Sequence, residues 1–538
     1  MDRPSVIATP IEPTAPVLPE RPQRLFLNHP TGLFVLFLVE MWERFSYYGM
    51  RALLVLYLIA LPSGSNPGRG MTKEAASDLY GVYTGMAYLL PILGGIIADK
   101  LIGAHRSMLV GGSLITLGHV MLAVSGLGTL GHTSLGLSIF VLGLALIVIG
   151  TGHFKPNVSV MVGGLYRAGD PRRDSAFTIF YMGINIGAFV CAFVCGTLGE
   201  RVGWHWGFGS AAVGMLIGLA IYCFARPIYL HGIGDAPPTG KPGLAFAFAA
   251  GGILLALVVA AAWHAHAFSL IGRGLNTIGA YAVGHFPLTW AIPIAALIGC
   301  VWFVRIQAAA DRGPTAVILL FILFNAIFWI AFEQAGTSLN LFGAEMTDRH
   351  IGSWEMPATW FQSVGALLVI LLAPVFAALW SMLEKRKLNP SQSIKIALAL
   401  FLLGGGYLFM VAGSIGTTPT ARASMFWLLA TYAMHTFGEL CISPTGLSFV
   451  TRVAPVRYLS FLMGLSFLAN SVANWAGGHL AGQIEKIDSG QIELFWYRWF
   501  KLGGQADFYF LFVVSSFSAG LLVLILTPLI RRLLGARR

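Results

Sequence analysis

The stretch GLFVLFLVEMWERFSYYGMRALLVLYLIA, residues 32–60, decides the fold class. It is long enough to cross a bilayer as a helix, which takes about 20 apolar residues. Among its apolar residues it carries the ionisable side chains Glu40, Glu43, Arg44 and Arg51, interleaved with Tyr47 and Tyr48. An ionisable group at the bilayer centre costs at least about 2.5 to 3.5 kcal/mol, so it normally faces a bundle interior or a cavity. At helical spacing these six residues share one face. A structural ion pair would explain Glu40 with Arg44 but not Arg51. We therefore predict that this helix lines a functional site and is not only a membrane anchor.

The composition indicates a polytopic membrane protein. Of 538 residues, 56% are hydrophobic and 11% are charged, whereas soluble proteins have about 25% charged residues. We therefore expect an all-α membrane protein with fourteen transmembrane helices. At about 20 residues per span, the apolar runs place these helices at 33–60, 75–100, 106–127, 137–163, 174–197, 207–225, 243–266, 287–306, 315–342, 355–382, 392–414, 422–450, 457–482 and 507–531.

The net charge of +11 reflects membrane topology rather than nucleic-acid binding. Lys and Arg collect in alternate loops, and the positive-inside rule then places both termini in the cytoplasm. Residues 1–30 are polar and Pro-rich, which predicts a disordered cytoplasmic tail instead of a cleaved signal peptide. The five cysteines all fall inside predicted helices without Cys-x-x-Cys spacing, so we expect neither disulfides nor a metal site.

A Pro-rich break after residue 226 divides the chain. We predict a six-helix bundle over 31–226, a linker with an extra peripheral helix hairpin over 227–312, and a second six-helix bundle over 313–538. Both bundles begin with a helix that bears an intramembrane glutamate, Glu40 in the first and Glu333 in the second. Two such halves around a central cavity form the architecture of many secondary transporters.

Four further polar residues interrupt predicted spans. Lys155 precedes a proline in the fourth span; it either faces inward or extends to the interface. Asn185 is suited equally to an interhelical hydrogen bond and to a ligand contact. Glu333 and Glu439 lie near mid-span with no adjacent Lys or Arg. Because an unpaired carboxylate is unfavourable there, each needs a cation from the protein or from a substrate.

Five motifs in order resemble the proton-dependent oligopeptide transporters, a peptide transporter family of the major facilitator superfamily. They are Glu40-x-x-Glu43-Arg44-Phe-Ser-Tyr47-Tyr48-Gly-Met-Arg51, Phe-Lys155-Pro-Asn, Phe180-Tyr181-x-x-Ile-Asn185-x-Gly, Phe332-Glu333-Gln334 and Gly438-Glu439-x-x-Ile-Ser-Pro. The resemblance spans about residues 30 to 530. The extra helix pair is similar to bacterial members, which implies a bacterial inner-membrane protein.

The resemblance implies a proton-coupled symporter that imports di- and tripeptides by alternating access. Its implied proton-coupling residues are Glu40, Glu43, Arg44, Lys155 and Glu333. Its implied peptide-binding residues are Arg51, Tyr47, Tyr48, Tyr88, Lys155, Asn185, Glu333, Glu439, Ser443, Trp329 and Trp475, with Trp360 as a further pocket wall. Arg51 and Lys155 would receive the peptide carboxylate, and Glu439 the amino group. We expect no cofactor beyond the proton gradient, no catalytic residue, and a monomer in the lipid bilayer.

One position departs from the family pattern. After Phe361-Gln362-Ser363 the family usually has Asn-Pro, whereas this chain continues Val364-Gly365-Ala366. An amide that would help to hold the peptide amino end is therefore absent. Three alternatives to a peptide transporter remain. The first is a transporter of the same fold that carries nitrate, another small anion or a drug; the second is a membrane enzyme, and the third is a receptor. Against an enzyme, the intramembrane charges are spread over both halves instead of forming one nucleophile or metal set.

Overall fold

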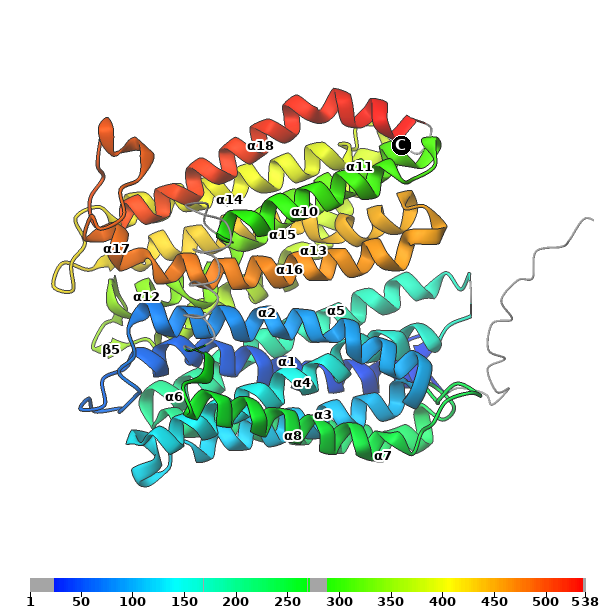
Figure 1. The fold of residues 1–538 in the computed structure, drawn as a ribbon, viewed down its shortest axis with the longest axis horizontal. Coiled ribbons are helices and arrows are strands. Elements are labelled where there is room, and N and C mark those ends of the chain that lie inside the picture. Colours follow the sequence, from blue (N-terminus) through cyan, green and yellow to red (C-terminus); the bar gives the residue numbers. More distant parts are fainter. Residues whose placement is uncertain (1–23, 168, 269, 271–287, 536–538) are drawn as a thin grey trace, which may run out of the picture.

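The computed structural model describes residues 24–167, 169–268, 270 and 288–535. In this part of the chain long helices run side by side in two layers, one from each half of the sequence (Figure 1). Nine helical stretches of the described residues are apolar and long enough to cross a membrane. The predicted all-helical membrane fold is therefore confirmed. The number fourteen is not confirmed by this criterion, although every predicted span overlaps a helix.

The N-terminal half has its own apolar core. Its α2 continues through a π-helical turn into α3, and α3 packs closely on α4 because glycines meet there: a Cβ on Gly111 would lie 2.6 Å from the Gly150 oxygen. The elements of this half are α1 (Thr31–Ile59), α2 (Lys73–Ile97), the turn η1 (Ala98–Ile102), α3 (Gly103–Val124), η2 (Gly128–His132), α4 (Ser134–Gly164), α5 (Arg172–Cys191), η3 (Ala192–Gly196), α6 (Thr197–Arg201) and α7 (Trp204–Tyr229).

The C-terminal half packs around a second core. Its first long helix breaks at Glu333, where a 3₁₀ turn leads into a short helix. The elements are α11 (Ala309–Phe332), η4 (Glu333–Gly336), α12 (Ser338–Glu345), η5 (Ala358–Trp360), α13 (Phe361–Lys385), α14 (Gln392–Ser414), α15 (Met425–Val453), η6 (Val456–Tyr458), α16 (Leu459–Gly482), α17 (Ile484–Asp488), η7 (Phe495–Arg498) and α18 (Ala506–Leu534).

The strands are short and lie outside the helices. β1 (Leu25–Phe26) pairs antiparallel with β2 (His29–Pro30), and β4 (His350–Ile351) pairs antiparallel with β5 (Trp354–Glu355). β3 (Thr347–Asp348) pairs in parallel with β6 (Ala423–Ser424). The expectation of disorder up to residue 30 is therefore wrong for residues 25–30, which form a hairpin; residues 1–23 lie outside the described part of the chain.

The two extra helices do not form the predicted peripheral hairpin. α8 (Leu244–His264) packs on α3 and α4, whereas α10 (Leu288–Arg305) packs on α11 of the other half (Figure 1). The buried face of α8 carries Gly252, Ala256 and Ala260 at intervals of four. Small residues at this spacing let a helix lie close against neighbouring helices. The sequence therefore contained a packing signal that length and hydropathy alone did not reveal.

The end of the bundle opposite the C-terminus, called the distal end below, contains α6, α12 and α17 (Figure 1). Here the two cores join, because Leu341 of α12 packs among residues of the N-terminal half. In the described part of the chain, each hydrogen bond and ion pair between the halves lies in the middle or distal part of the helices, as with Asn340 Nδ2 donating to the Ala52 oxygen at 2.9 Å. The structure is thus closed distally.

Candidate functional site

The charged face of α1 forms a buried ionic cluster. Arg44 Nε lies 3.1 Å from Glu40 Oε1 and also pairs with Glu43. All three side chains are at most 5% exposed. Glu40 Oε2 and Arg44 Nη2 have no hydrogen-bond partner among the described residues. Two carboxyl groups therefore share one guanidinium, and one carboxyl oxygen is left unsatisfied.

Arg51, two turns further along α1, connects the halves. Its guanidinium forms an ion pair with Glu333 of the C-terminal half and donates to the Tyr80 hydroxyl. Glu333 is held at the break between α11 and η4, where the neighbouring Gln334 donates to the Gly477 oxygen at 2.8 Å. The sequence predicts that Glu333 needs a cation from the protein or from a substrate, and the structure pairs it with Arg51 of the protein.

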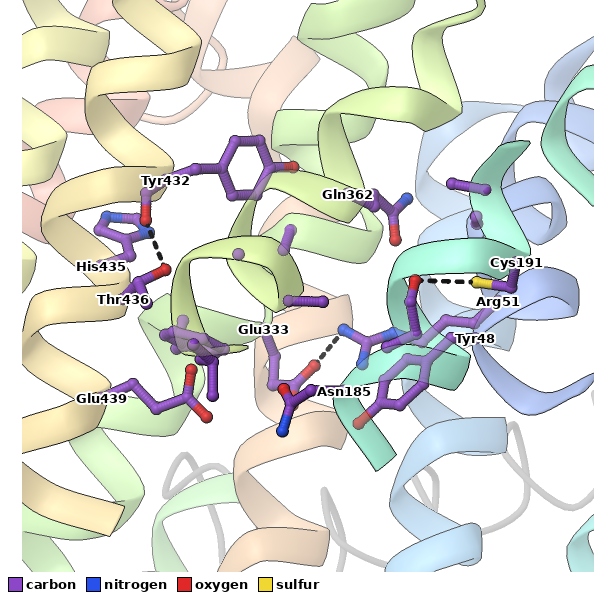
Figure 2. A pocket seen from close by; sticks show the side chains of 18 of the residues that line it. Tyr48, Arg51, Asn185, Cys191, Glu333, Gln362, Tyr432, His435, Thr436 and Glu439 are labelled. Atoms are coloured by element: carbon purple, nitrogen blue, oxygen red, sulfur yellow. Dashed lines mark hydrogen bonds and ion pairs between the residues drawn. The ribbon is translucent and has the colours of Figure 1, made fainter. Parts of the chain in front are cut away.

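A cavity of about 160 Å³ lies beside this ion pair, between the two halves (Figure 2). Both halves contribute polar and aromatic side chains to it. Seven of the predicted site residues line the cavity: Tyr48, Arg51, Tyr88, Asn185, Trp329, Glu333 and Glu439.

The opposite charges of the cavity come from different halves. Arg51 enters from α1 and Glu439 from α15, and in Figure 2 Glu333, the partner of Arg51, lies between them. Glu439 lies next to Tyr181 of α5 and within 4.0 Å of no lysine or arginine in the described part of the chain. A cationic and an anionic group thus face one cavity, and the anionic group has no counter-ion among the described residues.

Lys155 and Asn185 lie on the N-terminal side. The Lys155 ammonium sits 3.7 Å from the centre of the Tyr88 ring, a cation–π contact, and within 4.0 Å of no carboxylate of a described residue. Because its ammonium lies on the ring of Tyr88, which lines the cavity, Lys155 faces inward instead of extending to the interface. Asn185 donates to the Tyr181 oxygen in its own helix at 3.0 Å and still lines the cavity.

Among the expected pocket residues with described side chains, Tyr47, Lys155, Trp360 and Trp475 do not line the cavity. Tyr47 packs between Arg44 and Tyr83. Trp360 donates to Thr197 at the distal end. Trp475 is 52% exposed and stacks on His479, so its assignment as a pocket wall is wrong in this conformation. Ser443 lies in α15, but its side chain is outside the described part of the structure.

Sequence reasoning missed five polar residues of the site: Tyr80, Gln362, Tyr432, His435 and Thr436. Tyr432, His435 and Thr436 precede Glu439 by seven, four and three residues, so all four share a face of α15. This spacing was readable from the sequence, because polar residues on the face of an intramembrane carboxylate mark a cavity-lining stripe. Tyr80 gave no such signal, since only its hydrogen bond to Arg51 sets it apart from a core tyrosine.

Comparison with known proteins gives this cavity a family context. The model of the POT family matches residues 105–497. The peptide transporter YePEPT of Yersinia enterocolitica is 38% identical over 86% of this chain and 89% of its own length. A di-/tripeptide transporter of Lactococcus lactis is 34% identical over 95% of this chain and 98% of its own.

Solved structures agree with the sequence comparison. The crystal structure of a mutant of the peptide transporter POT in complex with alafosfalin has a TM-score of 0.78 and 33% identity, and the match covers 96% of this chain and 98% of that chain. The resemblance drawn from the five motifs is therefore confirmed, and the fold is that of a known transporter family. The chain belongs to the POT family.

Proposed function

We propose that this protein is a proton-coupled symporter that imports di- and tripeptides across the bacterial inner membrane by alternating access. One observation carries the proposal: a single cavity between the halves presents Arg51 from one half and, from the other, Glu439, which has no Lys or Arg partner among the described residues. A short peptide is a zwitterion whose two ends complement these charges. Such a site recognises the main-chain ends and tolerates different side chains.

Peptide binding would exchange ion pairs instead of creating new buried charges. The peptide carboxylate competes with Glu333 for Arg51, and the peptide ammonium supplies the cation that the described residues do not offer to Glu439. Glu333 then needs a new counter-charge or a proton, because an uncompensated buried charge is costly. Lys155 is available for either carboxylate, since its ammonium lies on the Tyr88 ring and pairs with no carboxylate of a described residue.

The α1 cluster is suited to carry the proton. Its two carboxylates and one guanidinium give a net charge of −1 when all are ionised. A proton on the unsatisfied Glu40 Oε2 makes the cluster neutral and removes an unpaired charge from the membrane interior. Arg44 and Arg51 lie two turns apart on α1. This protonation therefore changes the charge close to the peptide site, and no chain of further residues is needed to carry the effect from Glu40 to Arg51.

The remaining features follow from this proposal. Both termini lie in the cytoplasm, so the distal end, which is closed, faces the periplasm. The membrane potential favours inward movement of each positive charge by about 2.3 kcal/mol at 100 mV. The protein acts as a monomer and uses the proton gradient with no cofactor.

The test is transport in proteoliposomes by the Glu40→Gln variant. Glutamine keeps the size of the side chain but cannot take up a proton, so accumulation of Ala-Ala driven by a pH gradient should fall to the level of empty liposomes. Counterflow exchange of Ala-Ala, which needs no net proton movement, should stay within about twofold. Glu493→Gln, an exposed change outside the site, serves as the matched control.

Two results would contradict the proposal. Equal loss of gradient-driven uptake and counterflow would remove the coupling role of Glu40. Uptake of nitrate in place of peptides, with no competition by any dipeptide, would instead identify a transporter of a small anion.

A further inference from the structure

A polar hollow of about 490 Å³ lies apart from the peptide cavity, at the end of the bundle opposite the distal end. The start of α3, the end of α7 and the linker that follows α7 form its walls. Its ionisable lining residues are His105, Arg106, Arg226 and Asp235. None of them takes part in the proposed peptide and proton chemistry.

The walls of the hollow are held together by backbone contacts. The linker docks on α3, because the backbone N–H of His105 donates to the Gly234 oxygen at 2.8 Å. A glycine is required at the start of α3: Gly103 has a φ of +82°, and a Cβ there would lie 2.5 Å from the Ala236 nitrogen. The fold therefore fixes the lining residues of α3 and of the linker relative to one another.

The hollow has a net positive charge. Arg226 Nη2 forms an ion pair with Asp235 Oδ1 at 2.5 Å, whereas Arg106 pairs with no carboxylate of a described residue. The Nδ1 atom of His105 is hydrogen-bonded to the Tyr222 hydroxyl at 2.8 Å, so only its Nε2 is left for a ligand. Guanidinium groups match the oxygen geometry of a phosphate, and the hollow therefore suits a phosphate group.

The face of α3 that continues from Arg106 is open to lipid. Four residues follow Arg106 at intervals of 3, 7, 10 and 14 positions and share its face: Leu109, Ser113, Thr116 and Val120. All four are partly or fully exposed, although they lie in an apolar stretch that is long enough to cross a membrane. They extend about 21 Å along the helix, which exceeds the hydrocarbon thickness of one leaflet, about 15 Å.

The helices beside this face give it the shape of a groove. α3 packs against both α7 and α8 (Figure 1), and the hollow lies where α7 ends and where the linker leads into α8. A phosphate group in the hollow would thus stand at one end of an apolar, membrane-exposed groove. A lipid uses both parts, whereas a free phosphate compound would use only the hollow.

We propose that the hollow binds the phosphate of an anionic phospholipid and that one acyl chain of this lipid lies along the exposed face of α3. Arg106 and Arg226 hold the phosphate. Asp235 weakens the site, because it competes with the phosphate for Arg226. The proposed topology places this end at the cytoplasmic surface, where anionic lipids attract Lys and Arg side chains.

The experiment measures lipid binding to the full-length protein in detergent by native mass spectrometry. Phosphatidylglycerol is compared with phosphatidylcholine, which has the same phosphate and chains but no net charge. One Lys or Arg near an anionic lipid contributes about fivefold in affinity, which corresponds to about 1 kcal/mol. We therefore expect the first phosphatidylglycerol to bind at least about fivefold more tightly than phosphatidylcholine.

Two variants should change this preference in opposite directions. Arg106→Gln removes the guanidinium without a carboxylate partner and should lower the affinity for phosphatidylglycerol about fivefold. Asp235→Asn removes the competing carboxylate and should raise the affinity by a similar factor. Arg173→Gln removes an exposed arginine at the start of α5, outside the hollow, and should leave the affinity within twofold of the parent.

Each affinity is divided by that for phosphatidylcholine in the same variant, so a partly unfolded sample does not imitate the result. Equal affinity of the parent for the two lipids overturns the proposal. So does an equal decrease in Arg106→Gln and Arg173→Gln, which would indicate attraction by net charge alone. If millimolar inorganic phosphate raises the unfolding temperature of the parent but not of Arg106→Gln, and neither lipid is preferred, the ligand is a free phosphate compound and the lipid site is overturned.

Discussion

Glu200 of α6 forms a contact that exists only while the distal end is closed. Its carboxylate accepts hydrogen bonds from the backbone N–H groups of Ala358 and Thr359, both at 2.9 Å, and from the Thr359 hydroxyl at 2.7 Å. These donors form the N-terminus of η5, which leads into α13. A carboxylate from one half thus caps a helix of the other half, where the helix dipole favours a negative charge. We predict that Glu200→Ala shifts the protein towards the distally open state.

The free energy by which Glu200 stabilises the closed state follows from the number and kind of its hydrogen bonds. A hydrogen bond to a charged group contributes about 1.5–3 kcal/mol, but the Glu200 side chain is 15% exposed and water replaces part of this when the halves separate. We therefore expect a total of about 2–3 kcal/mol, which changes the ratio of closed to open molecules by about 30- to 150-fold. Glu200→Gln keeps one acceptor oxygen, so it should shift the ratio by only about tenfold.

Distance measurements between spin labels report this ratio directly. Ser65 and Ser489 lie in exposed distal segments of opposite halves and can be replaced by cysteine for labelling, after Cys223 and Cys300 are changed to serine. Double electron–electron resonance in nanodiscs should then show a second, longer distance in Glu200→Ala.

The control and the refuting result concern the same pair of labels. Glu493→Gln removes a carboxylate at the distal end that pairs with no described residue, and it should leave the distance distribution unchanged. An unchanged distribution in Glu200→Ala would show that the cap contributes less than about 1 kcal/mol and that the other distal contacts determine closure. A shift of equal size in Glu493→Gln would show that net charge, rather than the cap, is responsible.

Two further predictions concern the site and the packing. Glu439→Ala removes the group assigned to the peptide amino end and should weaken Ala-Ala binding at least tenfold in a titration; affinity within twofold of the parent would contradict this assignment. Gly94→Ala should lower the thermal unfolding temperature in detergent, because its Cβ would lie 2.0 Å from the Gly152 oxygen between α2 and α4. Gly251→Ala, whose Cβ would have no neighbour within 4 Å, should not lower it, since alanine is the better helix former.

Much of the fold was predictable because membrane insertion leaves few choices. Each long apolar run must form a helix to satisfy its backbone hydrogen bonds, so all fourteen predicted spans overlap helices. The packing of the two extra helices was not predicted correctly. Hydropathy gives the length of α8 but does not say which helices it packs against. Only the small residues Gly252, Ala256 and Ala260 on one face of α8 indicated contact with the N-terminal half.

The candidate site was predictable in part for a similar reason. An ionisable residue within an apolar run is conspicuous, and Arg51, Glu333 and Glu439 all reach one cavity. Aromatic residues are common throughout membrane helices, so Trp475 could not be distinguished from a true pocket wall, and it lies outside the cavity. The cavity residues Gln362 and Tyr432 are uncharged, which made their signal weaker than that of the glutamates.

The sequence by itself determined that charges lie on one face of α1 and that each half brings an intramembrane carboxylate, because helical periodicity and the cost of burying a charge act locally. Only the tertiary structure decided that Glu333 pairs with Arg51 and not with Lys155, and that Glu439 has no described cation partner. Arg51 and Glu333 are 282 positions apart. A contact at that separation depends on how the two halves pack, and local periodicity carries no information about it.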